Sequence, residues 1–506
     1  MQPTSEKIVD FKTLQQRFSD EYNRVFPDKL AAKAVVIIPS LTFDQEILAK
    51  IDGITYYEER MLCLLMLLRM PNTHVIYVTS IPVDNIIMDY YLHLLPGVTN
   101  YHARQRLTML SCFDASAKSL TEKILERPRL IQRIKKSIPP GHIAHIACFN
   151  VTEAERELAV KLQLPIFGCD PDLLYLGTKS YGKKIFRECN VNTPGGFEDC
   201  RTEEDVIRAL VELKKNDSLL KKAVIKLNDG FSGEGNAIFS FPQKIADDDL
   251  YGWLKENLHH QLHMVARTLT YRTFFKKLRL MGGITEIFLE GDQRAFPSAQ
   301  CRITPIGEVE VVSTHDQILG GEDGQVFIGA RFPANDEYAV DIGNIAREVA
   351  GRMKTLGVIG RFAIDFISVK QDDKWEHYAI EINLRKGGTT HPYLMLQYLT
   401  DGNYDANNGT YSTANGQQRY YFFSDNLQSK NYKGLTPHDL IEITTVNDLL
   451  YDGSNQEGVM FHMISALSQY GKLGTLCIAS SPEKAIQLYN KTIAVLEREK
   501  NNFQMD

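Results

Sequence analysis

The first third of the chain alternates short apolar runs with segments of helical periodicity. Buried strands are predicted at 34–38, 74–79, 106–112 and 142–148, and helices at 57–70, 83–95 and 152–162. Such alternation is typical of a parallel sheet covered by helices on both faces. The loop after the first strand, PSLTFDQ, contains no glycine, so the dinucleotide-binding fingerprint is absent. The pattern therefore predicts an α/β domain that is Rossmann-like in layout only.

From about residue 176 onward, strands and helices come in blocks, which favours an α+β arrangement. Helices are predicted at 179–189, 203–214 and 336–356, and strands at 221–228, 237–241, 283–289, 299–304, 308–313, 360–370 and 375–384. After Thr400 the segment DGNYDANNGTYSTANGQQ has the composition of a loop or domain boundary, and a helix is predicted at 482–498. We expect three domains, at 1–170, 171–400 and 401–506.

The hairpin of 360–370 and 375–384 has a polar face rich in possible ligands. Folding it about Asp373 places Asp365 opposite Glu381, and alternation puts Asn383 and Arg385 on the same face. The other face is expected to point into a core and consists of Ile364, Phe366, Ile380, Ile382 and Leu384. Facing carboxylates repel each other unless a cation lies between them, and carboxylate and amide oxygens suit magnesium. The alternative is an ordinary solvated face.

A glycine-rich loop, NDGFSGEGN at 228–236, lies between two predicted strands. Its glycines allow backbone N–H groups to approach phosphate oxygens, but it lacks the Lys-Ser/Thr ending of a P-loop. This order predicts a flap over a nucleotide, although an ordinary hairpin turn has the same composition. Lys226 lies on the strand before the loop and Lys179 opens a helix. A triphosphate is a natural partner for buried lysines, although a surface position also fits each one.

Several motifs in this order resemble the ATP-grasp superfamily. They are GTKSYGKKIF with Lys179, VIKLNDGFSGEG with Lys226, GGITEIFLEG, RFAIDF with Asp365, and EINLRKGGTTHP. More closely, the chain is similar to carboxylate–amine ligases of the pheganomycin-type peptide ligase group, along nearly its whole length. The resemblance implies an α/β pre-ATP-grasp domain, an α+β ATP-grasp domain and a small C-terminal α+β domain specific to ligases.

The resemblance also implies roles for single residues. Lys179 and Lys226 would contact the phosphates of ATP, and Arg385 would face the transferred phosphate. The closing loop would contain Gly230, Ser232, Gly233 and Gly235. The strand from Glu286 to Leu289 would lie along adenine, and either Glu290 or Gln293 would bind the ribose. Magnesium would be held by Asp365, Glu381 and Asn383.

The expected activity is an ATP-dependent ligation of a small-molecule or peptide carboxylate to an amine through an acyl phosphate. Lys226 and Arg385 are the expected catalytic residues, and no side-chain nucleophile is needed, in agreement with the lack of a G-x-S-x-G motif. An ATP-grasp kinase and a non-catalytic nucleotide-binding protein remain as alternatives. The loop of 315–331 is a second candidate lid. His315, His462 and Lys472 are expected in core or surface positions.

Composition narrows the class of protein further. The 506 residues are 43% hydrophobic and 24% charged with a formal net charge of -6, which disfavours a general nucleic-acid binder. The longest apolar run, 61–68, is far shorter than the roughly 20 residues of a membrane span, and the N-terminus lacks a signal-peptide core. Eight scattered cysteines indicate neither a zinc site nor disulfides, so a reduced, cytoplasmic protein is expected. Whether the chain forms a homo-oligomer is left open.

Overall fold

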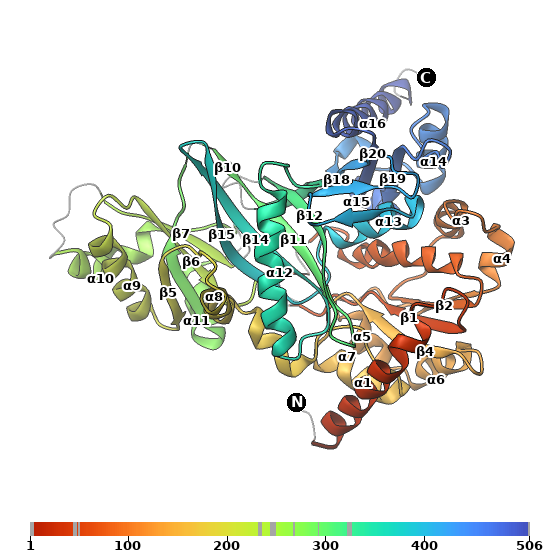
Figure 1. Ribbon diagram of the computed structural model, residues 1–506. Coiled ribbons are helices and arrows are strands. Elements are labelled where there is room, and N and C mark those ends of the chain that lie inside the picture. The colour runs from red at the N-terminus through yellow and green to blue at the C-terminus, as the bar shows by residue number, and fades with distance from the viewer. Residues whose placement is uncertain are drawn as a thin grey trace.

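The computed structural model describes residues 5–43, 48, 51–230, 235–242, 249–266, 269–291, 293–320 and 326–503. Within these residues the strands form a parallel sheet of four strands, an antiparallel sheet of five and a larger antiparallel sheet of nine, besides a two-stranded ribbon. Figure 1 shows the larger sheet in the middle, with the smaller antiparallel sheet and its helices on the left, the N-terminal sheet at the lower right and the C-terminal elements at the upper right. In the described part of the chain, no helix has the length and apolar character needed to cross a membrane.

The N-terminal sheet confirms the predicted α/β layout. Its order is β3-β2-β1-β4, all parallel, with β1 at Lys33–Ile38, β2 at Thr73–Thr79, β3 at Leu107–Ser111 and β4 at Ile143–Cys148. The helices are α1 (Ser5–Val25), η1 (Ile54–Arg69, a 3₁₀ helix), α3 (Asn85–His93), α4 (Asn100–Arg104), α5 (Leu120–Leu125), α6 (Pro128–Ser137) and α7 (Glu153–Leu162). Alternate residues of β1 enter different cores, with Val35 and Ile37 in one and Val36 and Ile38 in the other. The sheet is therefore covered on both faces.

The smaller antiparallel sheet carries the glycine-rich loop. Its order is β5-β9-β6-β7-β8, at Gly196–Cys200, Gly283–Ile287, Lys222–Leu227, Asn236–Ser240 and Leu262–Met264. Its helices are α8 (Lys179–Glu188), α9 (Glu203–Asn216), α10 (Leu250–Gln261) and α11 (Tyr271–Met281). The 3₁₀ helix η2 (Pro171–Gly177) lies directly before α8. The predicted order of strand, glycine loop and strand is confirmed, because Lys226 pairs with Asn236. Ala223 and Ile225 face the core under α9 to α11.

The larger sheet continues past the predicted domain boundary at residue 400. Its strands before residue 400 are β10 (Arg294–Ala295), β11 (Pro297–Ile303), β12 (Val309–Gly320), β13 (Val326–Phe332), β14 (Gly360–Gln371) and β15 (Lys374–Asn383). The C-terminal strands β18 (Tyr420–Gln428), β20 (Lys472–Ala479) and β19 (Gly458–His462) join them through the pair Ala330 and Phe423. The division at residue 400 remains a prediction.

The other elements cover this sheet or follow it. They are α12 (Ala339–Thr355), α13 (Thr390–Thr400), β16 (Asn403–Asp405), β17 (Thr410–Ser412), η4 (Lys430–Tyr432), α14 (Pro437–Val446), η5 (Ile464–Ala466), α15 (Leu467–Tyr470) and α16 (Pro482–Phe503). The loop predicted at 315–331 is wrong for the described residues, because β12 continues to Gly320, β13 begins at Val326, and the two strands pair with each other. Its tip, 321–325, lies outside the described residues.

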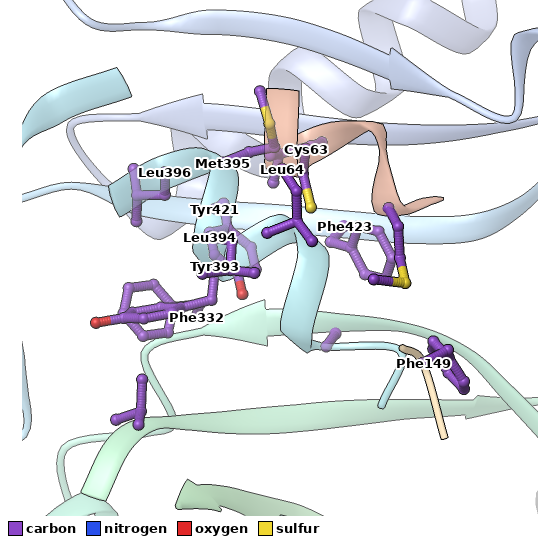
Figure 2. Close-up of a cluster of buried hydrophobic side chains, with 14 of the residues drawn as sticks. Cys63, Leu64, Phe149, Phe332, Tyr393, Leu394, Met395, Leu396, Tyr421 and Phe423 are labelled. Atoms are coloured by element: carbon purple, nitrogen blue, oxygen red, sulfur yellow. The ribbon is translucent and has the colours of Figure 1, made fainter. Parts of the chain in front are cut away.

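Segments distant in sequence meet in one apolar cluster beside the junction of β13 and β18 (Figure 2). The rings of Phe332 and Tyr421 are stacked at 4.9 Å between centroids. Tyr393 of α13 packs edge-on against Phe332, at 5.4 Å between ring centroids. Cys63 of η1 lies in the same view, near α13. The N-terminal part, the large sheet and the C-terminal strands thus share one core.

A buried ionic cluster attaches α8 to the smaller sheet. Glu286 of β9 accepts from Lys183 of α8 at 2.8 Å and pairs with Lys226 of β6 at 2.7 Å. Burial alone would raise the pKa of Glu286, but Lys226 and Lys183 lower it below its ordinary value. Glu286 is therefore ionised at neutral pH, and it fixes both lysines.

The β13–β18 junction depends on a close backbone approach at Gly329. A side-chain carbon there would lie 2.2 Å from the carbonyl oxygen of Phe423. We predict that Gly329→Ala lowers the midpoint of thermal unfolding, with a loss of about 1–3 kcal/mol typical of overpacking. The control is Gly351→Ala within α12, where an added carbon would have no neighbour within 4 Å. It should keep or raise the midpoint because alanine favours helix. Equal effects in the two variants would contradict the junction.

The ionic cluster generates a second prediction. Lys183→Met leaves Glu286 with one lysine, and loss of a partner in a buried pair costs about 3–5 kcal/mol at neutral pH. Because the folded pKa of Glu286 is lowered, its contribution is present above its ordinary pKa of 4.5 and is lost as pH falls through the folded value. The difference between variant and parent, measured by urea unfolding, should therefore shrink in acid.

The neighbouring lysine provides the matched control. Lys184 pairs with Asp199 at 2.8 Å, but their side chains are 41% and 56% exposed. An exposed pair of this kind contributes about 0–1 kcal/mol, so Lys184→Met should leave stability nearly unchanged. If Lys183→Met were equally mild, the cluster would not hold α8 in place.

Candidate active site

A cavity of about 830 Å³ brings together most of the predicted site residues. Its walls come from η1, α8, the smaller sheet, β12 to β15 and the C-terminal strands. The predicted residues that line it are Lys179, Lys226, Gly230, Gly235, Glu286, Leu289, Asp365, Glu381, Asn383 and Arg385. Ser232 and Gly233 were also predicted, but they lie outside the described residues. The volume lies within the range of small-molecule and cofactor pockets.

The β14–β15 hairpin has the predicted register at its polar end. Asp365 pairs with Glu381, and Ala363 pairs with Asn383. The two-residue turn consists of Asp372 and Asp373, both with positive φ. That turn alone would place Asp365 opposite Ile380, but a bulge after Asp365 shifts the pairing by one residue. The facing carboxylates are thus confirmed, and they depend on the bulge.

The bulge also changes one predicted orientation. Ile380 was expected to point into the core, but it is half-buried and lines the cavity. The extra residue of a bulge has no partner on the facing strand, so the strict alternation of side chains is broken there. Ile364 and Ile382 are fully buried as predicted, on either side of this irregularity.

The two facing carboxylates differ in their surroundings. Burial and the neighbouring Glu381 raise the pKa of Asp365 to about 6. Burial would also raise the pKa of Glu381, but Lys179 and Arg385 lower it, and Lys179 Nζ lies 3.2 Å from Glu381 Oε1. Asn383 and Gln317 each donate a hydrogen bond to Asp365, at 2.8 Å and 3.0 Å. The pair has an excess of negative charge that a bound cation would offset.

Lys179 is held at the start of α8 beside the glycine-rich loop. The side chain of Thr178 caps the helix, and Asn228 accepts from the backbone of Lys179 at 3.2 Å through its carbonyl oxygen. The two ends of the loop lie close together, because a side-chain carbon on Gly230 would be 3.7 Å from Gly235 Cα and 3.9 Å from Lys179 Nζ. The base of the loop therefore lies directly beside this lysine.

Arg385 and its neighbour are anchored to the N-terminal sheet. The Arg385 guanidinium lies 5.3 Å from the ring centroid of Phe43. The next residue, Lys386, donates from its backbone to the carbonyl of Phe149 at 3.1 Å and from its side chain to the carbonyl of Cys148. Burial lowers the pKa of Lys386 to about 8. The end of β4 thus fixes the segment that carries Arg385 over the cavity.

Some predicted residues lie away from the cavity. Glu290 and Gln293 are exposed and do not line it, so their assignment to the ribose remains a prediction. His315 is fully buried and bonded to the Tyr421 hydroxyl at 2.7 Å. Burial lowers its pKa to about 3, which keeps it neutral. This agrees with a structural role for His315.

Sequence reasoning missed a group of charged residues on the cavity wall. Lys472 was expected in the core or on the surface, but it lines the cavity, as do Arg60 and Asp425. His462 is buried, as expected, and contacts Asp425 at 2.6 Å. The available signal was Asp425 itself, a charged residue within the otherwise apolar strand YYFFSDNLQ. Arg60 directly precedes the apolar run of 61–68, and no local pattern distinguishes it from an ordinary charged residue.

Family models match two parts of the chain. The model described as IQCH-like, ATP-grasp matches residues 172–247 and 243–407, and the model described as PGM1 C-terminal domain matches residues 439–492. An L-propargylglycine–L-glutamate ligase of Streptantibioticus cattleyicolor is 29% identical over 459 residues, which cover 89% of this chain and 91% of that protein. The residues that match the IQCH-like, ATP-grasp model include the glycine-rich loop and the carboxylate pair.

Solved structures share the fold at low sequence identity. A biotin carboxylase–beta-gamma-ATP complex from Campylobacter jejuni has a TM-score of 0.54 and 14% identity, covering 93% of this chain and 95% of that one. The biotin carboxylase domain of a Hydrogenobacter thermophilus 2-oxoglutarate carboxylase, solved with MgADP, ADP and bicarbonate, has a TM-score of 0.53 and 13% identity, covering 93% and 94%. The lysines, the glycine-rich loop and the facing carboxylates all lie within residues 172–407, which match the ATP-grasp family model, and the solved structures show that the chain shares their fold.

Proposed function

We propose that the protein activates the carboxylate of a small molecule or peptide as an acyl phosphate and joins it to an amine, with release of ADP and phosphate. It is an ATP-dependent ligase that forms a C–N bond, in agreement with its similarity to an amino-acid ligase over most of both chains. The single observation that carries the mechanism is the cavity in which Asp365 and Glu381 face each other beside Lys179, Lys226 and Arg385.

The residues present fit a magnesium ion. Asp365 and Glu381 offer carboxylate oxygens and Asn383 can offer an amide oxygen. Burial and the facing Glu381 raise the pKa of Asp365, and a cation between the two carboxylates would offset that cost. We propose that these three residues hold magnesium. Bound there, the ion supplies positive charge that offsets the charge of the ATP phosphates.

The side chains around the ion would align the reactants. Lys179 and Lys226, buried at the base of the glycine-rich loop, are placed to bind the phosphates, and the Glu286 cluster keeps Lys226 in position. The substrate carboxylate oxygen attacks the γ-phosphorus, and the bond to ADP breaks. The amine then attacks the acyl carbon, phosphate leaves, and the nitrogen loses a proton. Arg385 is placed to stabilise the negative charge on the acyl oxygen or the departing phosphate.

The remaining nucleotide contacts are part of the same proposal. The backbone of Glu286 to Leu289 lies on the cavity wall and would run along adenine, while Glu290 or Gln293 would reach the ribose from the rim. Closure of the loop between Gly230 and Gly235 would exclude water, which otherwise hydrolyses an acyl phosphate. Bound nucleotide should therefore protect this segment.

Removal of one facing carboxylate tests the metal site. Glu381→Ala should abolish ADP formation in the presence of ATP, magnesium and a pooled library of amino acids and peptides. The fold should remain intact, because Glu381 is on the cavity side and not in the core. Glu376→Ala is the control, since Glu376 lies exposed on the same strand. Turnover of ATP at the parental rate by Glu381→Ala would refute the metal assignment.

Addition of hydroxylamine separates a ligase from a kinase in the same assay. An acyl phosphate reacts with hydroxylamine to give a hydroxamate, so hydroxamate should form with ATP and the substrate acid alone. A phosphorylated hydroxyl gives no hydroxamate. ADP formation without hydroxamate, together with a phosphorylated product by mass spectrometry, would favour a kinase.

A further inference from the structure

One end of the cavity holds two buried cations beside the same tyrosine ring. Arg60 of η1 is 4% exposed and Lys472 of β20 is 6% exposed. The Arg60 guanidinium lies 4.5 Å from the ring centroid of Tyr57, and Lys472 Nζ lies 5.2 Å from it and donates to its hydroxyl at 3.0 Å. Because one ring contacts both side chains, the two positive charges belong to one place on the wall.

Some hydrogen-bond donors of these two cations are unsatisfied. Arg60 Nη1 pairs with Asp425 at 3.3 Å, but its Nε and Nη2 are buried and have no partner among the described residues. Within the same part of the chain, no carboxylate lies within 4.0 Å of Lys472 Nζ. A buried cation without a partner is costly, and a bound carboxylate would satisfy several of these donors at once.

Asp425 does not neutralise the pair, because its oxygens are shared among other groups. His462 Nε2 lies 2.6 Å from Asp425 Oδ1, and His391 Nε2 lies 3.4 Å from the same atom. Asp425 therefore fixes Arg60 and leaves the positive charge of Lys472 uncompensated. The wall here has a surplus of positive charge that faces the cavity.

The position of these positive charges in the cavity indicates which substrate carboxylate they can bind. The Arg60 guanidinium lies 5.0 Å from the ring centroid of Phe149, and the carbonyl of Phe149 accepts from the backbone of Lys386, the residue after Arg385. Arg60, Phe149 and Arg385 line the same cavity, so the subsite adjoins the place where the acyl phosphate would form. In an α-amino acid, the amine and the carboxylate are separated by a single carbon atom. A carboxylate bound at this end thus brings its own amine to the reacting acyl group, whereas the reacting carboxylate itself must lie against the phosphates.

We propose that Arg60 and Lys472 form a subsite for the non-reacting carboxylate of the amine substrate, so that the acceptor is an amino acid or a peptide with a nearby free carboxylate. This inference rests on the proposed ligase function. It adds the requirement that the acceptor carries a free carboxylate as well as its amine, which would exclude ammonia, simple amines and amino-acid amides as efficient acceptors.

A metal ion is the competing occupant of this region. His391, Asp425 and His462 each offer one ligand atom within 4.8 Å of the others. However, Arg60 contacts the only carboxylate of the three, and its positive charge opposes a divalent cation there. The arrangement therefore favours an organic anion over a metal.

The test compares acids with amides as acceptors. The protein, ATP and magnesium are incubated with a mixture of L-amino acids, and acceptors in the ligated products are identified by mass spectrometry. The kcat/KM of each acceptor is then compared with that of its α-carboxamide. Hydrogen bonds to charged groups contribute about 1.5–3 kcal/mol, so the acid should be preferred by roughly 10- to 150-fold. Equal use of acid and amide by the parent protein would overturn the inference.

Variants assign the preference to the subsite. Lys472→Met should lower the kcat/KM of the acid much more than that of the amide and so remove most of the preference, and Lys472→Arg should restore part of it. Lys433→Met, at an exposed lysine of the same C-terminal part, should keep the parental preference. The folding of Lys472→Met is checked by its thermal midpoint, and Lys472→Gln is measured in its place if the methionine variant unfolds. Full preference for the acid in a folded variant that lacks the positive charge would refute the assignment.

Two further readouts separate the remaining possibilities. Hydroxamate formation requires the acid substrate but no acceptor, so Lys472→Met should lower it much less than it lowers ligation to the free amino acid. An equal loss of hydroxamate and ligation would place the bound carboxylate on the acid substrate and overturn the acceptor assignment. Stoichiometric zinc in the purified protein, lost in His391→Ala, would overturn it in favour of a metal. If the parent forms neither hydroxamate nor ADP, the ligase function itself fails instead.

Discussion

Repulsion between Asp365 and Glu381 is the constraint on which the site depends. Two carboxylates opposed across strands destabilise a hairpin, and burial adds to that cost because it disfavours charge. The protein offsets part of it with Lys179 and Arg385, which keep Glu381 ionised, while Asp365 retains a raised pKa. Further positive charge would offset the remaining repulsion, which is the physical basis of the proposed magnesium–nucleotide site.

Three separate parts of the chain meet to hold this hairpin. The smaller sheet contributes Lys226, α8 contributes Lys179, and the cluster at Glu286 joins this helix to this sheet. The N-terminal sheet anchors the segment after Arg385 through Lys386. The C-terminal strands extend the same sheet as the hairpin. Each part supplies charge from a different direction, so the cavity lies where no single part has a complete site of its own.

Much of the fold and half of the chemistry could be read from the sequence, because periodicity is a local property. The four parallel strands, the glycine loop and the polar hairpin face all follow from spacing of two or 3.6 residues. The pairing of Asp365 with Glu381 was predicted by folding about Asp373, yet the true turn lies half a residue away and a bulge restores the register. No local sequence pattern predicts that bulge, so the predicted orientation of Ile380 was wrong.

The missed residues show a different limit, since Arg60, Asp425 and Lys472 are separated by more than 400 positions at the extremes and meet only through tertiary packing. Each alone resembles an ordinary charged residue, and only the shared core of η1, α13 and β18 brings them together. Because β18 and β20 belong to the sheet that contains the hairpin, this end of the cavity is fixed relative to the carboxylate pair. The proposed positions of the amine and of the metal ion would therefore be held by one continuous sheet.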